Sequence, residues 1–203
     1  MIKAVIFDVG GVLIRTEDPA PRRALEVAHD LAPGQAEMLV FNSERGQAAQ
    51  RGEITTQQLW QWVGEELNLS AEETAAFQAA FFAGDFMDAA LVDFIRSLRP
   101  RYATGIISNA LDNLTHVITD LYPMADAFDV VVGSAFEKVM KPNPAIYHAA
   151  LDRLGVAPDQ AVFIDDFAHN IQGAKAVGME GIHFQPGVDV VVALQQLGVK
   201  CET

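Results

Sequence analysis

Short apolar segments recur along the chain, and each of them ends on polar or glycine residues. The first contains Ile2, Val5, Ile6 and Phe7 and ends at Asp8. Four more follow at Tyr102–Ile107, Phe128–Val132, Ala161–Ile164 and Gly181–Phe184. Apolar runs of this length with such boundaries predict buried strands.

Helical patterns separate these strands. They cover Ala89–Leu98, Asn113–Leu121, Pro144–Leu154 and Asn170–Val177. Pro144, just inside a helix start, and Gly155, just after the end of that helix, are typical helix boundaries. The alternation of strands and helices predicts an α/β fold with a Rossmann-like, doubly wound parallel sheet.

Residues 16–86 break this alternation. The stretch contains no strand-like run and has instead the helical patterns Arg22–Leu31, Gly34–Gln50, Thr56–Leu67 and Ala71–Ala83. Ser70 followed by Glu73 predicts a capping box for the last of these helices. We therefore predict an α-helical cap at residues 16–86, inserted into a Rossmann-like core made of residues 1–15 and 87–203. A helical unit over the carboxyl ends of a sheet acts as a lid.

The aromatic residues of this helical stretch are expected to form its internal core rather than to stack on a ligand. They are Trp60, Trp62, Phe77, Phe81 and Phe82. With 203 residues, of which half are hydrophobic, the chain can bury a core as one large domain with a modest insertion.

Charge and cysteine content restrict the class of protein further. Lysine and arginine total 14 and aspartate and glutamate total 27, which gives a formal net charge of −13. This balance excludes a non-specific nucleic-acid binder, which needs a positive surface. Cys201 is the only cysteine, so an internal disulfide framework and a cysteine-based zinc site are excluded.

We expect a cytoplasmic protein without a membrane partner. A single cysteine fits a reducing compartment. The first strand carries Asp8 and lacks the uninterrupted apolar stretch of a signal peptide, and no run approaches the roughly twenty apolar residues of a membrane helix. For the oligomeric state, monomer and homodimer both stay open.

Polar residues stand at the ends of the predicted strands. They are Asp8, Ser108 and Asn109, Lys141 in the loop after Ser134, and Asp165 with Asp166. Because parallel strands end at the same edge of a sheet, these groups should converge on one crevice. Crowded carboxylates require a cation, and oxygen ligands select Mg²⁺. A lysine and a hydroxyl beside that cation can bind the oxygens of a phosphate.

Each of these residues has an ordinary interpretation on its own, as a turn, a helix cap or a solvated lysine. Together they fall in four segments, FDVGGVL, ISNA, KPNPAIY and FIDDFAHNIQGAKAVG, each at a strand end. In this order the segments resemble the haloacid dehalogenase-like hydrolase superfamily, in the branch whose helical cap follows the first strand. The cap segment SERGQAAQRGEITTQQLW is similar to that of small sugar-phosphate phosphatases of the glucose-1-phosphate phosphatase type.

The resemblance implies a role for each matching residue. Asp8 would be the nucleophile that forms an aspartyl-phosphate, which water then hydrolyses. Ser108 would hold a phosphoryl oxygen, and Lys141 would neutralise charge in the transition state. The implied substrate is a small-molecule phosphate ester.

The same resemblance implies a Mg²⁺ site. Its ligands would be Asp8, the backbone carbonyl of Gly10 and Asp166, with Asp165 in the outer shell. Asn170, one helical turn after Asp166, would hold Lys141 or Asp166 in place.

Three further residues are expected near the substrate. Asn109 offers an amide to the phosphoryl oxygens. Gly11 suits the close turn of the first motif, where backbone approaches a ligand. Arg45 lies in a polar stretch of the predicted cap and is expected to contact a substrate oxygen.

Gly10 departs from the pattern of the family. Most phosphatases of this superfamily have a second aspartate there, two residues after the nucleophile, as general acid and base. Such help is worth about 10²–10⁴ in rate. We therefore expect a phosphatase that takes its proton elsewhere, for example from Glu17, Asp18 or Glu44, or that acts on esters with good leaving groups. The alternatives are a metal-independent 2-haloacid dehalogenase and a catalytically weakened binding or regulatory protein.

Overall fold

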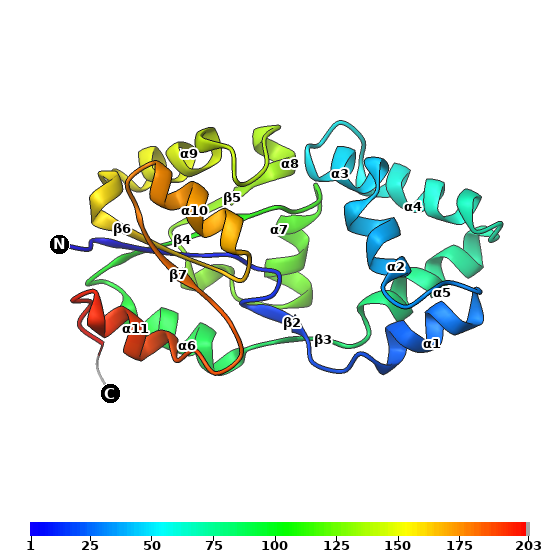
Figure 1. Cartoon of the computed structure of the whole chain (residues 1–203), viewed down its shortest axis with the longest axis horizontal. Coiled ribbons are helices and arrows are strands. Elements are labelled where there is room, and N and C mark those ends of the chain that lie inside the picture. Colours follow the sequence, from blue (N-terminus) through cyan, green and yellow to red (C-terminus); the bar gives the residue numbers. More distant parts are fainter. Residues whose placement is uncertain (202–203) are drawn as a thin grey trace.

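A five-stranded parallel sheet with strand order β5-β4-β1-β6-β7 forms the centre of the molecule in this computed structural model, which describes residues 1–201 (Figure 1). The strands are β1 (Ala4–Phe7), β4 (Ala103–Ser108), β5 (Val130–Gly133), β6 (Ala161–Asp165) and β7 (Glu180–His183). Phe7, the last residue of the middle strand, pairs with Ile106 on one side and Ile164 on the other. The ends of β1, β4 and β6 therefore meet at one edge, as predicted.

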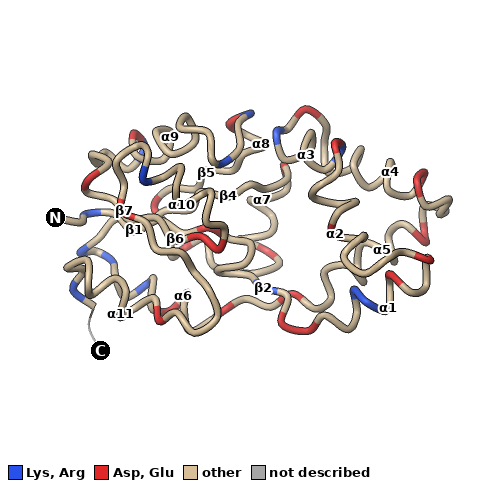
Figure 2. The backbone as a smooth tube through the Cα atoms, viewed as in Figure 1, with Lys and Arg blue, Asp and Glu red and all other residues tan. Residues whose placement is uncertain are grey.

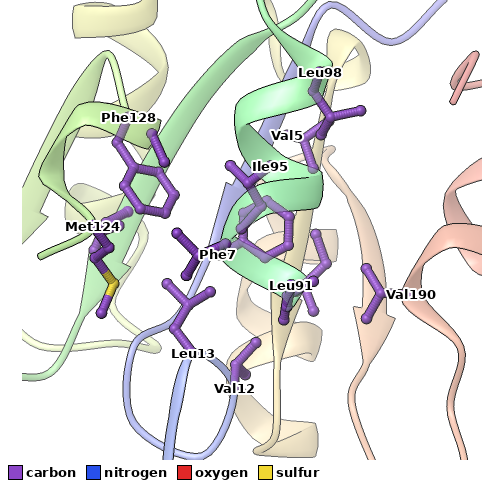
Figure 3. Packing of buried hydrophobic residues seen from close by; sticks show 14 of the residues in the cluster. Val5, Phe7, Val12, Leu13, Leu91, Ile95, Leu98, Met124, Phe128 and Val190 are labelled. Atoms are coloured by element: carbon purple, nitrogen blue, oxygen red, sulfur yellow. The ribbon is translucent and has the colours of Figure 1, made fainter. Parts of the chain in front are cut away.

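Successive residues of β1 face opposite sides of the sheet, and both sides are covered by helices. Val5 and Phe7 pack with α6 (Ala89–Leu98) and α11 (Val190–Gln196), as Figure 3 shows for one face. Ala4 and Ile6 pack with α9 (Pro144–Leu154) and α10 (Ala168–Ala176) on the other. A strand buried on both faces reads as a continuous apolar run, which is why β1 could be recognised. The predicted α/β, doubly wound architecture is confirmed.

Helix α11 was not among the elements predicted from the sequence. Its Val190–Val192 segment is β-branched, which is unusual at a helix start. The helix begins because the Asp189 side chain accepts a hydrogen bond from the Val192 amide at 3.1 Å.

Five helices form a separate bundle, which we call the cap. It lies beside the carboxyl ends of the sheet strands in Figure 1. They are α1 (Ala20–Ala28), α2 (Gln35–Glu37), α3 (Glu44–Gln50), α4 (Thr56–Glu66) and α5 (Ala71–Phe82). Trp60, Phe77 and Phe81 are buried in its core, with Trp62 and Phe82 packed against them, as predicted. Ser70 and Glu73 form the expected capping box.

The predicted single helix Gly34–Gln50 is wrong, because the chain turns at Ser43. After α2, residues Met38–Asn42 form a π-helical turn, and Ser43 is extended. The Ser43 hydroxyl then caps α3 by accepting a hydrogen bond from Gly46 at 3.0 Å. A Cβ on Gly46 would lie 2.3 Å from the Val40 carbonyl, so glycine permits this close return of the chain. Similarly, the predicted helix Asn113–Leu121 divides into α7 (Leu114–His116) and a π-helical turn at Val117–Leu121.

A short antiparallel pair of strands, β2 (Ile14–Thr16) and β3 (Asp85–Met87), joins the cap to the sheet-containing core. The expectation of no strand within residues 16–86 is therefore wrong at both ends of that stretch. Three-residue strands are too short for a periodic pattern to reveal. Arg15 on β2 pairs with Asp88 at 2.8 Å and helps to fix this junction.

The cap also contacts the core at a second place, through α8 (Ser134–Glu137) and the loop after β4. The buried Ser134 hydroxyl donates a hydrogen bond to the Gln50 carbonyl at 2.6 Å, and Lys138 Nζ donates to the Gly52 carbonyl at 2.6 Å. Asp112 accepts a hydrogen bond from the Thr56 amide at 3.0 Å. No helix within residues 1–201 has the length and apolar character needed to cross a membrane.

Replacing Phe81 with alanine should lower the free energy of unfolding by about 3–5 kcal/mol, because a buried ring is lost and a cavity is left. Phe81 is 1% exposed and packs edge-on against Trp60 and Phe82. Urea denaturation followed by circular dichroism measures the change. The matched control is Phe86→Ala, since Phe86 is 51% exposed and its loss should change stability by no more than about 0.5 kcal/mol. Equal stability of the two variants would contradict the placement of Phe81 in the cap core.

Candidate active site

Three carboxylates meet where β1 and β6 end. Asp8, Asp165 and Asp166 each have an oxygen that lies within 4.8 Å of one on each of the other two. Figure 2 shows the acidic positions gathered beside the end of β6. Asp8 and Asp165 are buried and Asp166 is partly buried. The parallel sheet thus brings residues separated by more than 150 positions in sequence to one point.

Lys141 connects these carboxylates. Its ammonium is buried and lies 2.8 Å from Asp8 Oδ1 and 2.7 Å from Asp165 Oδ2. It also donates a hydrogen bond to the Ile107 carbonyl at 3.1 Å. An ammonium group has three donors, and all three are used here. The interpretation of Lys141 as a solvated surface lysine is therefore excluded.

Asp165 is held entirely by protein groups. Besides Lys141, it accepts hydrogen bonds from the Phe167 amide at 2.7 Å and from Asn170 Nδ2 at 3.0 and 3.1 Å. Asn170 was expected to hold Lys141 or Asp166, and the structure shows it on Asp165 instead. With both oxygens occupied, Asp165 is suited to orient Lys141.

Asp166 differs from Asp165 in having an unsatisfied oxygen. Its Oδ1 is buried and has no hydrogen-bond partner within residues 1–201. A buried carboxylate oxygen left in this way is costly unless a cation or water meets it. The Asp166 carboxylate packs directly against Gly11. A Cβ on Gly11, at φ +77°, would lie 2.2 Å from Asp166 Oδ2. Gly11 therefore shapes the position of Asp166, in addition to forming the close turn predicted from the sequence.

Burial raises the pKa of Asp8 to about 7, because the charged form loses its hydration. Lys141 lowers this pKa and Asp165 raises it again. Burial, followed by the charge of Asp165, also raises the pKa of Asp166. Burial is thus the main cause of both shifts, and the site in addition carries an excess of negative charge, since three carboxylates share one ammonium group. A divalent cation would balance that excess, so the donor set fits Mg²⁺.

Ser108 and Asn109 follow one another at the end of β4, but their side chains are used differently. The Ser108 hydroxyl makes no hydrogen bond with any described residue, so it can bind a ligand oxygen. The Asn109 amide accepts from the Lys141 amide at 2.8 Å and donates to the Lys141 carbonyl at 3.2 Å. Asn109 was expected to bind the substrate. In the structure its side chain instead fixes the backbone of the loop at Lys141 through two hydrogen bonds.

Arg45 lies in the first turn of α3, on the cap. It is exposed and forms no ion pair or hydrogen bond with residues 1–201. The structure does not bring it into contact with the acidic cluster. Its contact with a substrate stays a prediction.

Some groups at the site were not predicted from the sequence. The Val9 amide donates a hydrogen bond to Asp8 Oδ1 at 2.7 Å, and backbone donors cannot be recognised from residue type. His183 Nε2 lies 2.9 Å from the Asp166 carbonyl, and the Tyr147 hydroxyl donates to the Asn170 carbonyl at 2.8 Å. Both side chains fix the β6–α10 turn that carries the aspartates. Polar residues at the end of β7 and inside α9 were the available hints.

Comparison with known proteins identifies the family of this chain. The family model of haloacid dehalogenase-like hydrolases matches residues 2–178. A sesquiterpene phosphatase of Aspergillus oryzae is 28% identical over 196 residues, covering 96% of each chain. A phosphoglycolate phosphatase of Escherichia coli is 25% identical, covering 89% of this chain and 80% of its own.

The fold has solved counterparts. A HAD family enzyme from Bacteroides thetaiotaomicron, solved in complex with magnesium and inorganic phosphate, superposes with a TM-score of 0.78 at 22% identity. The match covers 95% of this chain and 99% of that one. From the family model and the shared fold, this chain belongs to the haloacid dehalogenase-like hydrolases.

Proposed function

We propose that this hydrolase is a Mg²⁺-dependent phosphatase that cleaves a small phosphomonoester through an aspartyl-phosphate on Asp8. The observation that carries the proposal is the buried Lys141 ammonium, bonded to Asp8 and Asp165 beside the unsatisfied Oδ1 of Asp166. The relatives named as phosphatases support the reaction. Their named substrates differ in the organic group, so they support the phosphomonoester class rather than one compound.

Asp8 has two oxygens with different surroundings. Oδ1 accepts from Val9 and faces Lys141, whereas Oδ2 has no hydrogen bond within the described part of the chain. Oδ2 is therefore the oxygen that attacks phosphorus. The positive charge of Lys141 and a hydrogen bond from the Ser108 hydroxyl then stabilise the charge that develops on the phosphoryl oxygens. Asp165 and Asn109 act indirectly, because they fix the Lys141 side chain and backbone.

Asp8, Asp166 and the Gly10 carbonyl would hold Mg²⁺, with Asp165 outside the coordination sphere. The unsatisfied Asp166 oxygen and the charge excess of the cluster support this assignment. When bound, the ion supplies charge neutralisation and orients the phosphate. Magnesium and phosphate together in the Bacteroides thetaiotaomicron structure support it as well.

A metal-independent dehalogenase is the second candidate. A dehalogenase from Xanthobacter autotrophicus shares the fold with a TM-score of 0.67 at 20% identity, which carries no information on chemistry. Against this candidate, a reaction without metal has no need for two further carboxylates beside the nucleophile. The buried, fully bonded Lys141 likewise argues against a purely binding or regulatory protein.

Asp8→Asn should reduce Mg²⁺-dependent hydrolysis of p-nitrophenyl phosphate to less than about one thousandth, because the amide cannot act as the nucleophile. Phosphate release with and without EDTA measures the effect. Asp120→Asn is the matched control, since Asp120 is exposed and, among residues 1–201, has His116 as its one side-chain partner. Turnover that persists in Asp8→Asn would refute the proposed nucleophile. Chloride release from 2-chloropropionate without metal would instead establish the dehalogenase.

Mg²⁺ affinity should rise with pH and level off above about 7. A metal ligand must be ionised, and the pKa of Asp8 is raised to about 7 in the protein alone. Below that pH, binding releases a proton, so affinity should fall by up to about tenfold per pH unit. Calorimetric titration with MgCl₂ at several pH values, in buffers of different ionisation enthalpy, measures the affinity and the number of protons released. Asp8→Asn should bind more weakly with a flatter profile, and an affinity independent of pH in the unmodified protein contradicts the assignment.

A further inference from the structure

Gly10 and Gly11 are adjacent, but only Gly11 has a conformation and a packing environment that require glycine. Gly11 has φ +77°, and a Cβ there would collide with Asp166 Oδ2 at 2.2 Å. Gly10 is not among the positive-φ glycines. Apart from its chain neighbours, no described heavy atom lies within 4 Å of where its Cβ would stand. Neither backbone conformation nor packing therefore requires glycine at position 10.

The space at Gly10 also shows that no carboxyl of a described residue occupies the volume that an aspartate side chain would fill at this position. The carboxyl oxygens of an aspartate lie well within 4 Å of its own Cβ, and the structure has no atom of residues 1–201 in that space apart from the chain neighbours. Those neighbours, Val9 and Gly11, carry no proton donor in their side chains.

Of the alternative donors suggested by the sequence, two are bonded to other protein groups and the third is exposed. Glu17 Oε1 lies 3.2 Å from Arg15 Nη2, and Asp18 accepts a hydrogen bond from the Ala20 amide at 2.9 Å. Glu44 is exposed in the first turn of α3. None of the three belongs to the carboxylate cluster that includes Asp8.

From this geometry we infer that the enzyme acts on phosphates of acidic hydroxyl groups, such as aryl, enol or anomeric hydroxyls, whose oxygen departs without receiving a proton from the protein. The inference rests on the proposed function and narrows its substrate class. General acid help is worth about 10²–10⁴, so an ester of an ordinary alcohol loses that factor here. An acidic leaving group does not need it.

The bonds and protons balance without a protein acid. Asp8 Oδ2 forms a bond to phosphorus while the bond from phosphorus to the leaving oxygen breaks, and that oxygen leaves with the electron pair. It is released as an oxyanion, which is protonated by water. In the second step water attacks phosphorus, its proton passes to a phosphate oxygen or to solvent, and Asp8 leaves as a carboxylate.

The second step lacks help from position 10 as well, and the choice of substrate cannot compensate for this. With an activated ester, formation of the aspartyl-phosphate is therefore faster than its hydrolysis. The phosphorylated form of Asp8 accumulates, and the first turnover precedes a slower steady state.

A leaving-group series tests the inference. The value of kcat/KM is measured with Mg²⁺ for p-nitrophenyl phosphate, less acidic substituted phenyl phosphates, phenyl phosphate and an alkyl phosphate. In the unmodified protein it should fall steeply as the leaving hydroxyl becomes less acidic. Gly10→Asp should raise the rates of the poor leaving groups by about 10²–10⁴ and flatten the dependence. Gly10→Asn has nearly the same size without a carboxyl proton and should stay steep.

Rapid-quench mass spectrometry gives a readout independent of steady-state rates. With p-nitrophenyl phosphate, the unmodified protein should carry a phosphoryl group on Asp8 and release a burst of p-nitrophenolate close to one equivalent. Both signals should shrink in Gly10→Asp.

The outcomes separate the inference from the proposed function. A shallow leaving-group dependence in the unmodified protein, or identical slopes for Gly10→Asp and Gly10→Asn, overturns the inference alone. Absence of turnover and of phosphorylated Asp8 across the whole series overturns the proposed function and the inference with it. If thermal denaturation shows that Gly10→Asp is not folded, the leaving-group dependence and the burst of the unmodified protein still decide between these outcomes.

Discussion

The buried ammonium of Lys141 is the interaction on which the site depends. It binds Asp8 after β1, Asp165 at the end of β6 and the Ile107 carbonyl of β4, so one side chain connects three adjacent strands. Removing one partner of such a buried pair leaves an uncompensated charge, at a cost of about 3–5 kcal/mol. The surrounding contacts are consistent with this cost, because Asn109 fixes the Lys141 backbone and Asn170 fixes Asp165.

The same interaction explains why the protein groups of the site do not balance one another's charge. Lys141 balances one of three carboxylates, and burial adds to the cost of their charge, as two observations show. The pKa of Asp8 is raised to about 7, and Asp166 Oδ1 has no partner among residues 1–201. Neutral side chains placed there would have avoided both costs. The arrangement is therefore one in which a cation and an anionic phosphate complete the balance of charge.

Much of the fold and of the site could be predicted from the sequence, and the failures have physical causes. Buried strands such as β1 are continuous apolar runs that the sequence alone displays, and the strand ends locate Asp8 and Asp165 directly. The break at Ser43 depends instead on the contact of Gly46 with the Val40 carbonyl, and the π-helical turn has no pattern of its own. The role of Asn109 depends on a loop 32 residues away, which only the folded chain brings near.

One hydroxyl group connects the cap to the active-site loop. Ser134 Oγ accepts a hydrogen bond from the Ala110 amide at 3.0 Å, directly after Ser108 and Asn109. Its single proton has two carbonyl acceptors, Gln50 of the cap at 2.6 Å and Ala110 at 3.2 Å. While the cap is docked, the shorter contact takes the proton. The Gln50 carbonyl of the cap and the Ala110 amide of the loop after β4 are therefore connected through the same hydroxyl group.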